Sequence, residues 1–352
     1  MVCYRIHIRN PLKGKIHPMT RKRTHATIKN VALKAGVSTA TVSRVLAGEG
    51  YVATKTKEKV ENAIAKLHYQ PSFIAQSLRS KNSKVISLIV TDIQNPYYPE
   101  LVRGVEDEAQ KRGYSLILCN SAGDPEREIS YINYLIQHRA EGIIICASGF
   151  LHRNSKLLKN YQGHIVLSDV DKDDSTYATI SSDGEGGGEL VGLHLVEVGY
   201  PQIMYIGDPD EEKDGYPRFN GLKKGAGKAP VHYFAGGASF ELGARAAEEI
   251  LAKYKPPFGV MAHNDLSAIG AMRVFLDRGY KVPEEIGVVG YDDIQLSAFT
   301  SPTLTTIHQD QRVLGMESLI MVDQLISGGK KPKGITIRTH LIARQSTRKK
   351  GK

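Results

Sequence analysis

Apolar and polar residues follow a helical period in three short segments near the start of the chain. The segments cover residues 27–36, 38–48 and 54–68, and in each the apolar residues share one helical face. Thr27 and Ser38 are suited to cap the first two helices, and Gly36 is suited to end the first. Two helices joined by a short turn with glycine, followed by a third helix, predict a helix-turn-helix unit.

The pattern changes at Val85, from which continuous apolar runs alternate with amphipathic segments. The expected strands cover 85–90, 115–119, 142–146, 165–167, 179–181, 203–206, 232–234, 259–261 and 286–289, and the expected helices cover 97–112, 125–138, 186–198, 240–253 and 265–277. Such apolar strands are typical of a parallel sheet covered on both faces. The units are too many for one sheet, so we predict an all-α helix-turn-helix head followed by an α/β core of two doubly wound lobes. Ligands in such lobes bind at the carboxyl ends of the strands.

Charge is distributed unevenly over the 352 residues, whose net charge is +10. Residues 1–80 hold 15 lysines and arginines against three acidic residues, whereas residues 81–347 hold 28 against 34. The last five residues add four positive charges. A basic head on a mildly acidic body indicates a nucleic-acid-binding module on a sensor or an enzyme; a solvated basic surface is the alternative.

Composition argues against several other classes of protein. The longest apolar runs are far shorter than the ~20 residues that span a bilayer, and no apolar stretch of a secretory signal follows the basic start. The three cysteines, Cys3, Cys119 and Cys146, are too few and too scattered for a disulfide framework or a metal site. We therefore expect a cytoplasmic protein without membrane contact.

The sequence lacks the common motifs of enzyme chemistry. It has no Walker A run, no Gly-x-Ser-x-Gly elbow and no His-Glu-x-x-His. The glycine run 184–188 opens a predicted helix but has Glu189 where a dinucleotide-binding motif needs glycine, so we interpret it as helix packing. Acidic clusters at 171–174 and 208–214 do not match a calcium loop. We expect no catalytic residue, no cofactor and no metal.

A composite motif in the head is highly specific. It reads Val31-Ala-x-x-Ala-Gly-Val-Ser-x-x-Thr-Val-Ser-Arg-Val-Leu46, then Tyr51-Val52, then Tyr69-x-Pro-x-x-x-Ala75-x-x-Leu78. Weaker motifs follow in the core, among them Asp92-Ile-x-Asn-Pro-Tyr-Tyr98, Gly290-Tyr-Asp292 and Leu304-Thr-Thr-Ile-His308. Together they resemble the lactose–galactose repressor (LacI/GalR) family of bacterial transcription regulators, from Thr27 to about Thr347. The resemblance implies a helix-turn-helix head, a hinge helix and a core of two periplasmic-binding-protein-like lobes.

Domain boundaries follow from these patterns and the resemblance. We expect a disordered basic extension at 1–24, the head at 25–70, a hinge helix and linker at 71–83, the core at 84–347 and a basic tail at 348–352. Lobe 1 is expected at about 84–181 and 310–332, and lobe 2 at about 182–308 and 334–347. Met19 lies just before the first patterned segment, which leaves open whether Met1 or Met19 is the native start.

The resemblance assigns DNA contacts to the head and the hinge. The assigned residues are Thr27, Ser38, Thr39, Ala40, Thr41, Ser43, Arg44, Tyr51, Thr56, Ala75 and Leu78. Thr39 and Ala40 match the base-discriminating pair, and Arg44 is long enough to pair with guanine, although a phosphate contact is the alternative. Leu78 matches a wedge that enters the minor groove, with Ala75 approaching closely; packing on the core is the alternative.

Other residues of the head match phosphate contacts, and one departs from the family pattern. Thr27, Thr41, Tyr51 and Thr56 fit positions that hold the DNA backbone. Ala53 stands where the family often has a serine cap, so the third helix is expected to lose about 1 kcal/mol of capping unless Thr54 takes over.

Effector contacts are implied in the cleft between the lobes. The matching residues are Tyr97, Tyr98, Arg218, Asn264, Asp265 and Asp292. A tyrosine ring can stack on a sugar ring or a base, and arginine and aspartate suit bidentate bonds to hydroxyls. Asp265 has a second interpretation of equal weight, as the cap of the helix that follows it. The acidic segment 208–217 disfavours an anionic effector, and Gly225 and Gly227 suggest a trimmed helix beside the cleft.

These expectations define a homodimeric, sequence-specific transcriptional regulator. We interpret it as a repressor of a catabolic or transport operon that binds a pseudo-palindromic operator and a small, sugar-like effector. One alternative is control by a partner protein that docks on the core; another is a two-lobe binding protein or enzyme without operator specificity. The C-terminal residues lack apolar heptads, so no tetramerising coiled coil is expected. The sequence does not identify the effector or the target genes. It also leaves open whether the effector acts as an inducer or as a co-repressor.

Overall fold

The computed structural model describes residues 26–48, 50–69, 83–146, 161, 163–169, 176–208 and 216–348. The chain divides into two compact units, Met1–Lys81 and Asn82–Lys352. The expected basic extension, most of the expected hinge with Ala75 and Leu78, and residues 349–352 lie outside the described residues.

Three helices form the head, as predicted. They are α1 (Ile28–Ala35), α2 (Thr39–Ala47) and α3 (Thr54–Leu67). Their apolar faces meet in one small core, in which Val31, Val42 and Val60 are fully buried. Gly36 and Gly48 take left-handed backbone angles at the ends of α1 and α2, where a side chain on Cβ would be strained.

The predicted helix caps of the head are confirmed. The Thr27 hydroxyl accepts from the backbone of Asn30, whose side chain in turn accepts from the Thr27 amide at 2.8 Å. The Ser38 hydroxyl accepts from the Thr41 amide at 3.1 Å. Ala53 precedes α3 without any side-chain cap bond. The third helix therefore starts without the stabilisation of about 1 kcal/mol that a capping hydroxyl provides.

Two α/β lobes form the second unit. Lobe 1 contains β1 (Val85–Val90), α5 (Tyr97–Lys111), β2 (Ser115–Asn120), α6 (Pro125–Gln137), β3 (Gly142–Cys146), β4 (His164–Ser168), β5 (Ala178–Ser182), α12 (Gln311–Ile326) and β11 (Ile335–Ile337). Lobe 2 contains α8 (Gly184–Glu197), β6 (Ile203–Gly207), α9 (Pro217–Ala226), β7 (Val231–Ala235), α10 (Phe240–Lys253), β8 (Phe258–Ala262), α11 (Asp265–Asp277), β9 (Ile286–Asp292), the short 3-10 helix η2 (Gln295–Ala298), β10 (Thr305–His308) and β12 (His340–Ile342).

Each lobe is built on a sheet of six strands. The order is β11-β5-β4-β3-β1-β2 in lobe 1 and β12-β10-β9-β8-β6-β7 in lobe 2. All neighbouring strands run parallel except β12, which pairs antiparallel with β10. The expected assignment of 334–347 to lobe 2 needs a correction, because β11 pairs with β5 in lobe 1 and the chain crosses to lobe 2 only afterwards.

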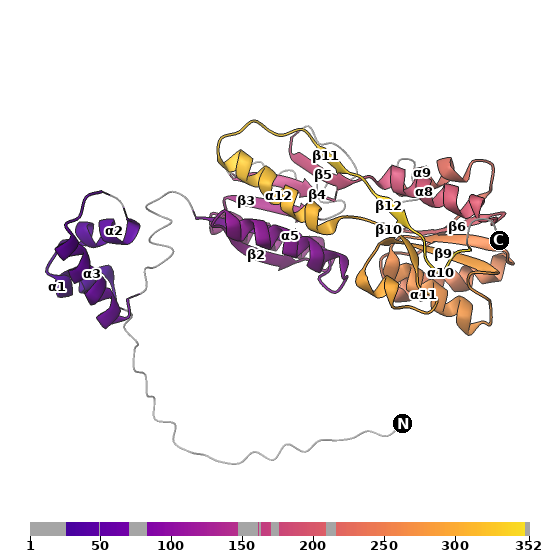
Figure 1. The fold of residues 1–352 in the computed structure, drawn as a ribbon, viewed down its shortest axis with the longest axis horizontal. Helices are drawn as coiled ribbons and strands as arrows, with labels where there is room; N and C mark the ends of the chain where they lie inside the picture. Colours follow the sequence, from indigo (N-terminus) through magenta and orange to yellow (C-terminus); the bar gives the residue numbers. More distant parts are fainter. Residues whose placement is uncertain are drawn as a thin grey trace, which may run out of the picture. The chain divides into compact units, whose positions relative to one another are not determined.

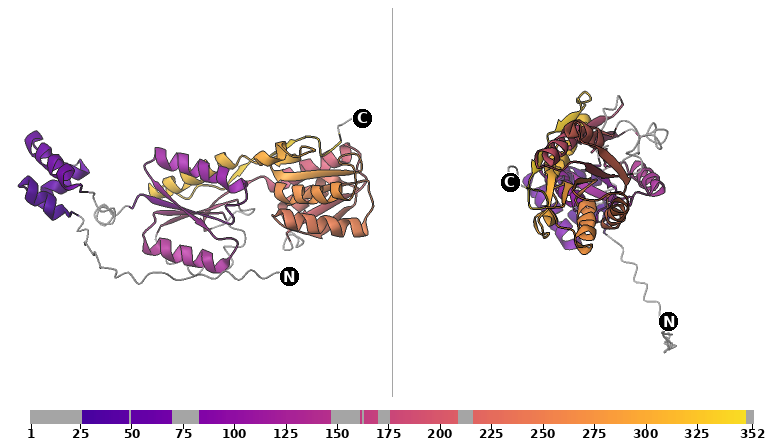
Figure 2. Two further views of the ribbon diagram at one scale, coloured as in Figure 1. Left: turned by 90° about the horizontal axis from the view of Figure 1, so that it is seen from below. Right: turned by 90° about the vertical axis from the view of Figure 1, so that its right-hand side faces the viewer.

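Helices cover both faces of each sheet, as the apolar strands predicted. In lobe 1, α5 and α12 lie on one face and α6 on the other (Figure 2). Alternate residues of β1 explain this arrangement, because Leu88 packs with α5 and α12 whereas Ile89 packs with α6. In lobe 2, α10 and α11 cover one face, and α8 and α9 cover the other.

Helices α8 and α9 pack unusually closely, and glycines make this possible. A Cβ on Gly188 would lie 2.1 Å from the Arg218 carbonyl oxygen, and a Cβ on Gly221 would lie 1.9 Å from the Glu185 carbonyl oxygen. The packing interpretation of the glycine run is therefore confirmed. Gly225 belongs to the same contact inside the ten-residue helix α9, so its small size serves helix packing, and the helix ends only at Ala226.

Candidate DNA-binding and effector sites

The outward face of α2 presents the residues that were expected to contact bases. Thr39, Ala40 and Arg44 are exposed, while Val42 is fully buried on the opposite side. Ser43 is half-buried. Two short side chains and one long basic one on a single exposed face suit contact with base edges in a major groove.

Several of the expected phosphate contacts are hydroxyl groups at the N-termini of the head helices. Thr27 and Ser38 cap α1 and α2, and the Thr41 hydroxyl lies 2.9 Å from that of Ser38. Tyr51 is 92% exposed, and Thr56 is half-buried in the first turn of α3. Amides at helix N-termini together with neighbouring hydroxyls suit binding of phosphate groups.

Asp292 lies at the carboxyl end of β9, where a doubly wound lobe binds its ligand. Its φ of 118° is strained for a residue with a Cβ, and such strain gathers at functional sites. Gln309 Nε2 donates to Asp292 Oδ1 at 2.7 Å, and Gln311 Nε2 donates to the Asp292 carbonyl at 2.5 Å. Burial raises the pKa of the Asp292 carboxyl, an effect that nearby Arg218 opposes.

Two tyrosines at the start of α5 face this carboxylate from lobe 1. Burial and then the charges of Asp169 and Asp292 raise the pKa of Tyr97, and burial raises the pKa of Tyr98. Both hydroxyls therefore stay protonated and able to donate. The two rings meet edge to face, with centroids 5.2 Å apart. Asp169, which directly follows β4, adds a second carboxylate to this group, and we call the place where these side chains approach one another the cleft.

Arg218 supplies the positive charge of the cleft from the first turn of α9. Its guanidinium lies over the Tyr291 ring, 4.0 Å from the centroid, and Nη1 donates to the His263 carbonyl at 2.9 Å. Its charge acts on Asp292, and those of Asp169 and Asp292 act on Arg218. Tyr97, Tyr98, Arg218 and Asp292 thus lie near one another, and their contact with an effector stays a prediction.

Gln309 is a cleft residue that the sequence analysis missed. Its Oε1 and the Tyr97 hydroxyl are buried atoms without a hydrogen-bond partner in the described part of the chain. Unsatisfied buried polar atoms are costly, so their persistence in a cleft points to a ligand. The signal was available, because Gln309 directly follows the motif that ends at His308.

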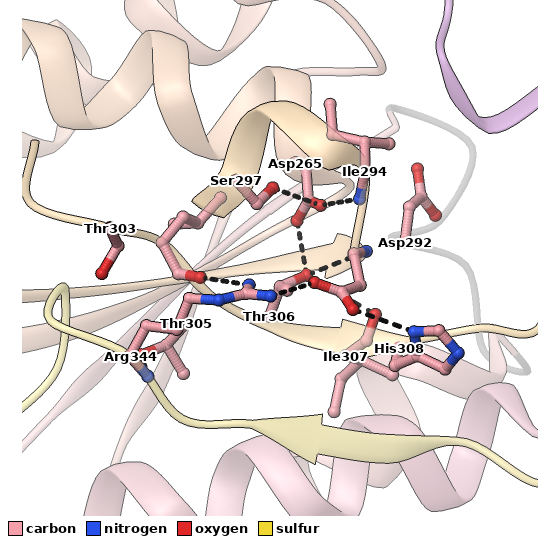
Figure 3. Close-up of polar contacts among 12 residues, drawn as sticks. Asp265, Asp292, Ile294, Ser297, Thr303, Thr305, Thr306, Ile307, His308 and Arg344 are labelled. Atoms are coloured by element: carbon pink, nitrogen blue, oxygen red, sulfur yellow. Dashed lines mark hydrogen bonds and ion pairs between the residues drawn. The ribbon is translucent and has the colours of Figure 1, made fainter. Parts of the chain in front are cut away.

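Asp265 lies close enough to Asp292 for its charge to raise the pKa of that carboxyl, but its own carboxylate is bonded within lobe 2. It is fully buried, and its carboxylate accepts from the Ile294 amide at 2.8 Å, the Ser297 hydroxyl at 2.7 Å and the Thr306 hydroxyl at 2.5 Å (Figure 3). It does not cap α11 either, because Asn264 does so.

The Asn264 side chain is also committed within lobe 2. Its Oδ1 accepts from the Ser267 amide at 2.9 Å, and its amide donates to the Ala238 carbonyl at 3.4 Å. Asn264 and Asp265 both shape the strand ends without presenting free polar atoms, so the proposed effector site below omits them.

A second polar cluster lies at the end of β10, where the chain leaves lobe 2. Asp293 accepts from Arg344 at 2.6 Å and lies 2.9 Å from the His308 ring nitrogen. Arg344 also donates to the Leu304 carbonyl at 2.8 Å. These bonds tie the C-terminal segment to the end of β10, next to the crossing into lobe 1.

The described residues contain neither a membrane-spanning helix nor a cluster of metal ligands. No helix among them is long and apolar enough to cross a membrane. No group of three or more potential metal ligands occurs within the same ranges. Cys119 and Cys146, the two cysteines in these ranges, are buried and free.

A helix-turn-helix head joined to two lobes with a polar cleft defines a ligand-responsive DNA-binding regulator. The model for bacterial regulatory proteins of the lacI family matches residues 27–72, and that for the periplasmic binding protein-like domain matches residues 193–347. An HTH-type transcriptional repressor PurR of Mannheimia succiniciproducens is 34% identical over 92% of this chain and 99% of its own. The chain belongs to the LacI family. It is a DNA-binding transcriptional repressor with an effector-binding core, and its relatives are repressors rather than enzymes.

Solved structures agree with this membership. The lac repressor dimer bound to operator and the anti-inducer ONPF is 29% identical, with a TM-score of 0.83, and the match covers 92% of this chain and 100% of that one. A CelR–cellobiose complex is 26% identical with a TM-score of 0.67 over the same shares of the two chains. The architecture predicted from the sequence is therefore confirmed.

Proposed function

We propose that the protein is a cytoplasmic, homodimeric repressor of a catabolic or transport operon, controlled by a neutral, sugar-like effector. The observation that supports the effector class is the balance of charge in the cleft. Among the described residues, Asp169 and Asp292 interact electrostatically with one cation, Arg218. An anionic ligand would bring a further negative group next to these two carboxyls, whereas a neutral polyol would not.

The mixture of hydrogen-bond donors and acceptors in the cleft also suits a polyol. Asp292 and Gln309 Oε1 offer acceptors, and Arg218 with the tyrosine hydroxyls offers donors. A sugar hydroxyl donates and accepts at once, so it satisfies such mixed sets. The Tyr98 ring is half-buried and suits stacking on a sugar ring or a nucleobase. Related structures carry cellobiose and ribose, which supports the first of these.

DNA binding is proposed to use the residues placed on the head together with the hinge. Thr39, Ala40, Ser43 and Arg44 would read bases, while Thr27, Ser38, Thr41, Tyr51 and Thr56 would hold phosphates. Leu78 would enter the minor groove and bend the operator, with Ala75 close to its floor. Replacing Leu78 by alanine should weaken operator binding by several kcal/mol without changing the stability of the core.

A second copy of the chain is proposed to cover an open edge of lobe 1. Strand β2 ends the sheet in the described part of the chain, and Leu118 in it is 36% exposed. An apolar edge strand of this kind invites pairing. In lobe 2, Phe299 is 76% exposed and Leu296 is 42% exposed on and after η2, which adds apolar surface for a partner. The solved lac repressor relative is a dimer.

The assembly has a direct test. Sedimentation equilibrium of the full chain at micromolar concentration should give the mass of two chains. A mass of four chains, or of one chain bound to operator, would contradict the proposed dimer.

The function itself is tested by selecting duplexes from a random pool with the full chain. Repeated selection should enrich a sequence with two-fold symmetry, with half-sites about one helical turn apart. Isothermal titration with neutral mono- and disaccharides, a sugar phosphate and a nucleobase then decides the effector class. Enrichment of a symmetric site with binding of a neutral sugar supports the proposal. Binding of the sugar phosphate alone, or enrichment without symmetry, contradicts it.

A further inference from the structure

The chain enters the core through a residue held in an unfavourable backbone conformation. Lys84 directly precedes β1 and has a φ of 51°, a left-handed value that costs energy for lysine. Its amide donates to Glu141 Oε1 at 2.6 Å, and its carbonyl accepts from the Ser115 amide at 2.8 Å. The first residues after the head-to-core segment are thus fixed in direction.

Glu141 directly precedes β3, an inner strand of the sheet, and backbone bonds to both neighbouring strands hold it in place. Its amide donates to the Val85 carbonyl at 2.9 Å, and its carbonyl accepts from the His164 amide at 3.0 Å. Its Oε2 is buried and has no hydrogen-bond partner among the described residues. A buried carboxylate with one oxygen left without a hydrogen bond lowers the stability of the fold. We therefore interpret the contact of Glu141 with Lys84 as the reason for a carboxylate at this position.

Tyr114 links the same lysine to α12. The Lys84 ammonium lies over the Tyr114 ring, 4.5 Å from its centroid. The Tyr114 hydroxyl donates to Asp323 Oδ1 at 2.8 Å, and Asp323 also accepts from Arg112. Asp323 lies in the last turn of α12, so the entry of the chain is tied to that end of the helix.

The other end of α12 meets the effector cleft. Gln309 and Gln311, at the crossing from β10 into α12, bond to the side chain and the backbone of Asp292. Helix α12 lies beside α5 along its length (Figure 1). Gly104 and Gly315 allow a backbone contact so close that a Cβ on either would lie 2.1 Å from a carbonyl oxygen of the other helix. Such packing resists bending, so a shift at one end moves the other.

We propose that Glu141 and Tyr114 anchor the segment that joins the head to the core, and that α12 couples this anchor to the effector cleft. Both are positioning residues, because they act through their contacts with Lys84 and Asp323. A movement of Asp292 pulls on Gln309 and Gln311, shifts α12, and changes how Lys84 is held. The affinity of the full chain for its operator then depends on the state of the cleft. The proposal rests on the role proposed above for Asp292.

A double-mutant cycle tests this coupling without knowledge of the effector. The probe is the duplex that the wild-type full chain enriches from a random pool, and Asp292→Asn perturbs the cleft. Operator Kd is measured with and without Asp292→Asn in wild type, Glu141→Ala, Glu141→Gln, Tyr114→Phe and the control Glu106→Ala. Glu106 is an exposed glutamate of the same lobe, with 59% of its side chain accessible.

The expected result is a loss of coupling at the anchor alone. Asp292→Asn should change operator Kd in wild type, and this change should shrink about threefold or more in Glu141→Ala and in Tyr114→Phe. Glu141→Gln should restore it, because an amide oxygen can still accept from Lys84, and Glu106→Ala should match wild type.

Two outcomes overturn the proposal. Equal effects of Asp292→Asn in wild type, Glu141→Ala and Tyr114→Phe would show that the anchor carries no coupling. No effect in wild type would show that the cleft does not act through α12. Tyr114→Phe decides the matter if Glu141→Ala fails to fold, since it keeps the ring under Lys84. Failure of the proposed effector site is seen separately, as unchanged sugar binding in Asp292→Asn.

Discussion

The buried carboxylate of Asp265 makes the stability of the core depend on pH in a specific direction. Burial raises its pKa to about 7 from a value of 3.8 expected in the unfolded chain, although three donors oppose the shift. A raised pKa means that the folded state binds the proton more tightly than the unfolded state. The stabilisation is therefore complete below pH ~4 and is lost as pH rises through the folded pKa.

Its size follows from the shift. About three pKa units at 1.36 kcal/mol each correspond to roughly 4 kcal/mol of unfolding free energy between pH ~4 and pH ~7. Asp265→Asn cannot titrate, so the difference in unfolding free energy between wild type and this variant should fall by that order across the window and be constant above pH ~8. Urea unfolding followed by circular dichroism at pH 4, 5, 6, 7 and 8 measures this difference. The contribution of the head to the unfolding free energy cancels, because the head is identical in both proteins.

The opposite slope would refute this reasoning. If wild type gains stability over Asp265→Asn as pH rises, the Ile294 amide and the Ser297 and Thr306 hydroxyls stabilise the anion more than burial penalises it. Parallel pH profiles would show that the carboxyl does not titrate in this range.

Three further predictions follow from the two sites and the helix packing. Arg44→Ala should reduce discrimination at one operator position by ~1–3 kcal/mol, whereas Lys55→Ala should weaken all duplexes alike and flatten the salt slope; equal profiles in a competition assay would argue against base contact. Tyr97→Phe should weaken binding of a sugar found by titration by about 1 kcal/mol or more, and unchanged affinity would remove its hydroxyl from the site. Gly188→Ala should destabilise the core by ~1–3 kcal/mol and weaken effector binding, because the new Cβ pushes the Arg218 backbone; the exposed Leu193→Ala is the control, and equal thermal shifts in the two variants would contradict the close packing of α8 and α9.

The local rules that the sequence obeys account for the elements it predicted well. Thr27, Ser38 and Gly36 act on their own helices through neighbouring atoms, so residue type and spacing were sufficient. The six residues of β1 are all buried, which is why a run that is apolar except for Ser87 marked its bounds correctly. Helix α12 escaped prediction because its buried face carries Gln311, Gly315 and Ser318 beside the apolar residues, which blurs a helical stripe.

The cleft was predictable only in part, for a similar reason. Arg218 and Asp292 were found through their motif positions, and the fold brings them together. Asp265 was misjudged because its partners, Ile294, Ser297 and Thr306, are distant in sequence and reach it only through the folded sheet. No spacing rule connects residues so far apart, so its burial could be seen only in three dimensions.

The placement of β11 has a consequence for how the protein is made. Ile335 pairs with Ile180, so the sheet of lobe 1 lacks its last strand until nearly the whole chain has left the ribosome. At ~5–20 residues per second, the delay between the two strands is on the order of ten to thirty seconds. Helix α12, which covers the core of lobe 1, arrives almost as late. During that interval the nascent lobe exposes β5 and the apolar surface that α12 later covers. A chaperone such as a ribosome-bound holdase has its target on this surface. The head is already complete at that stage.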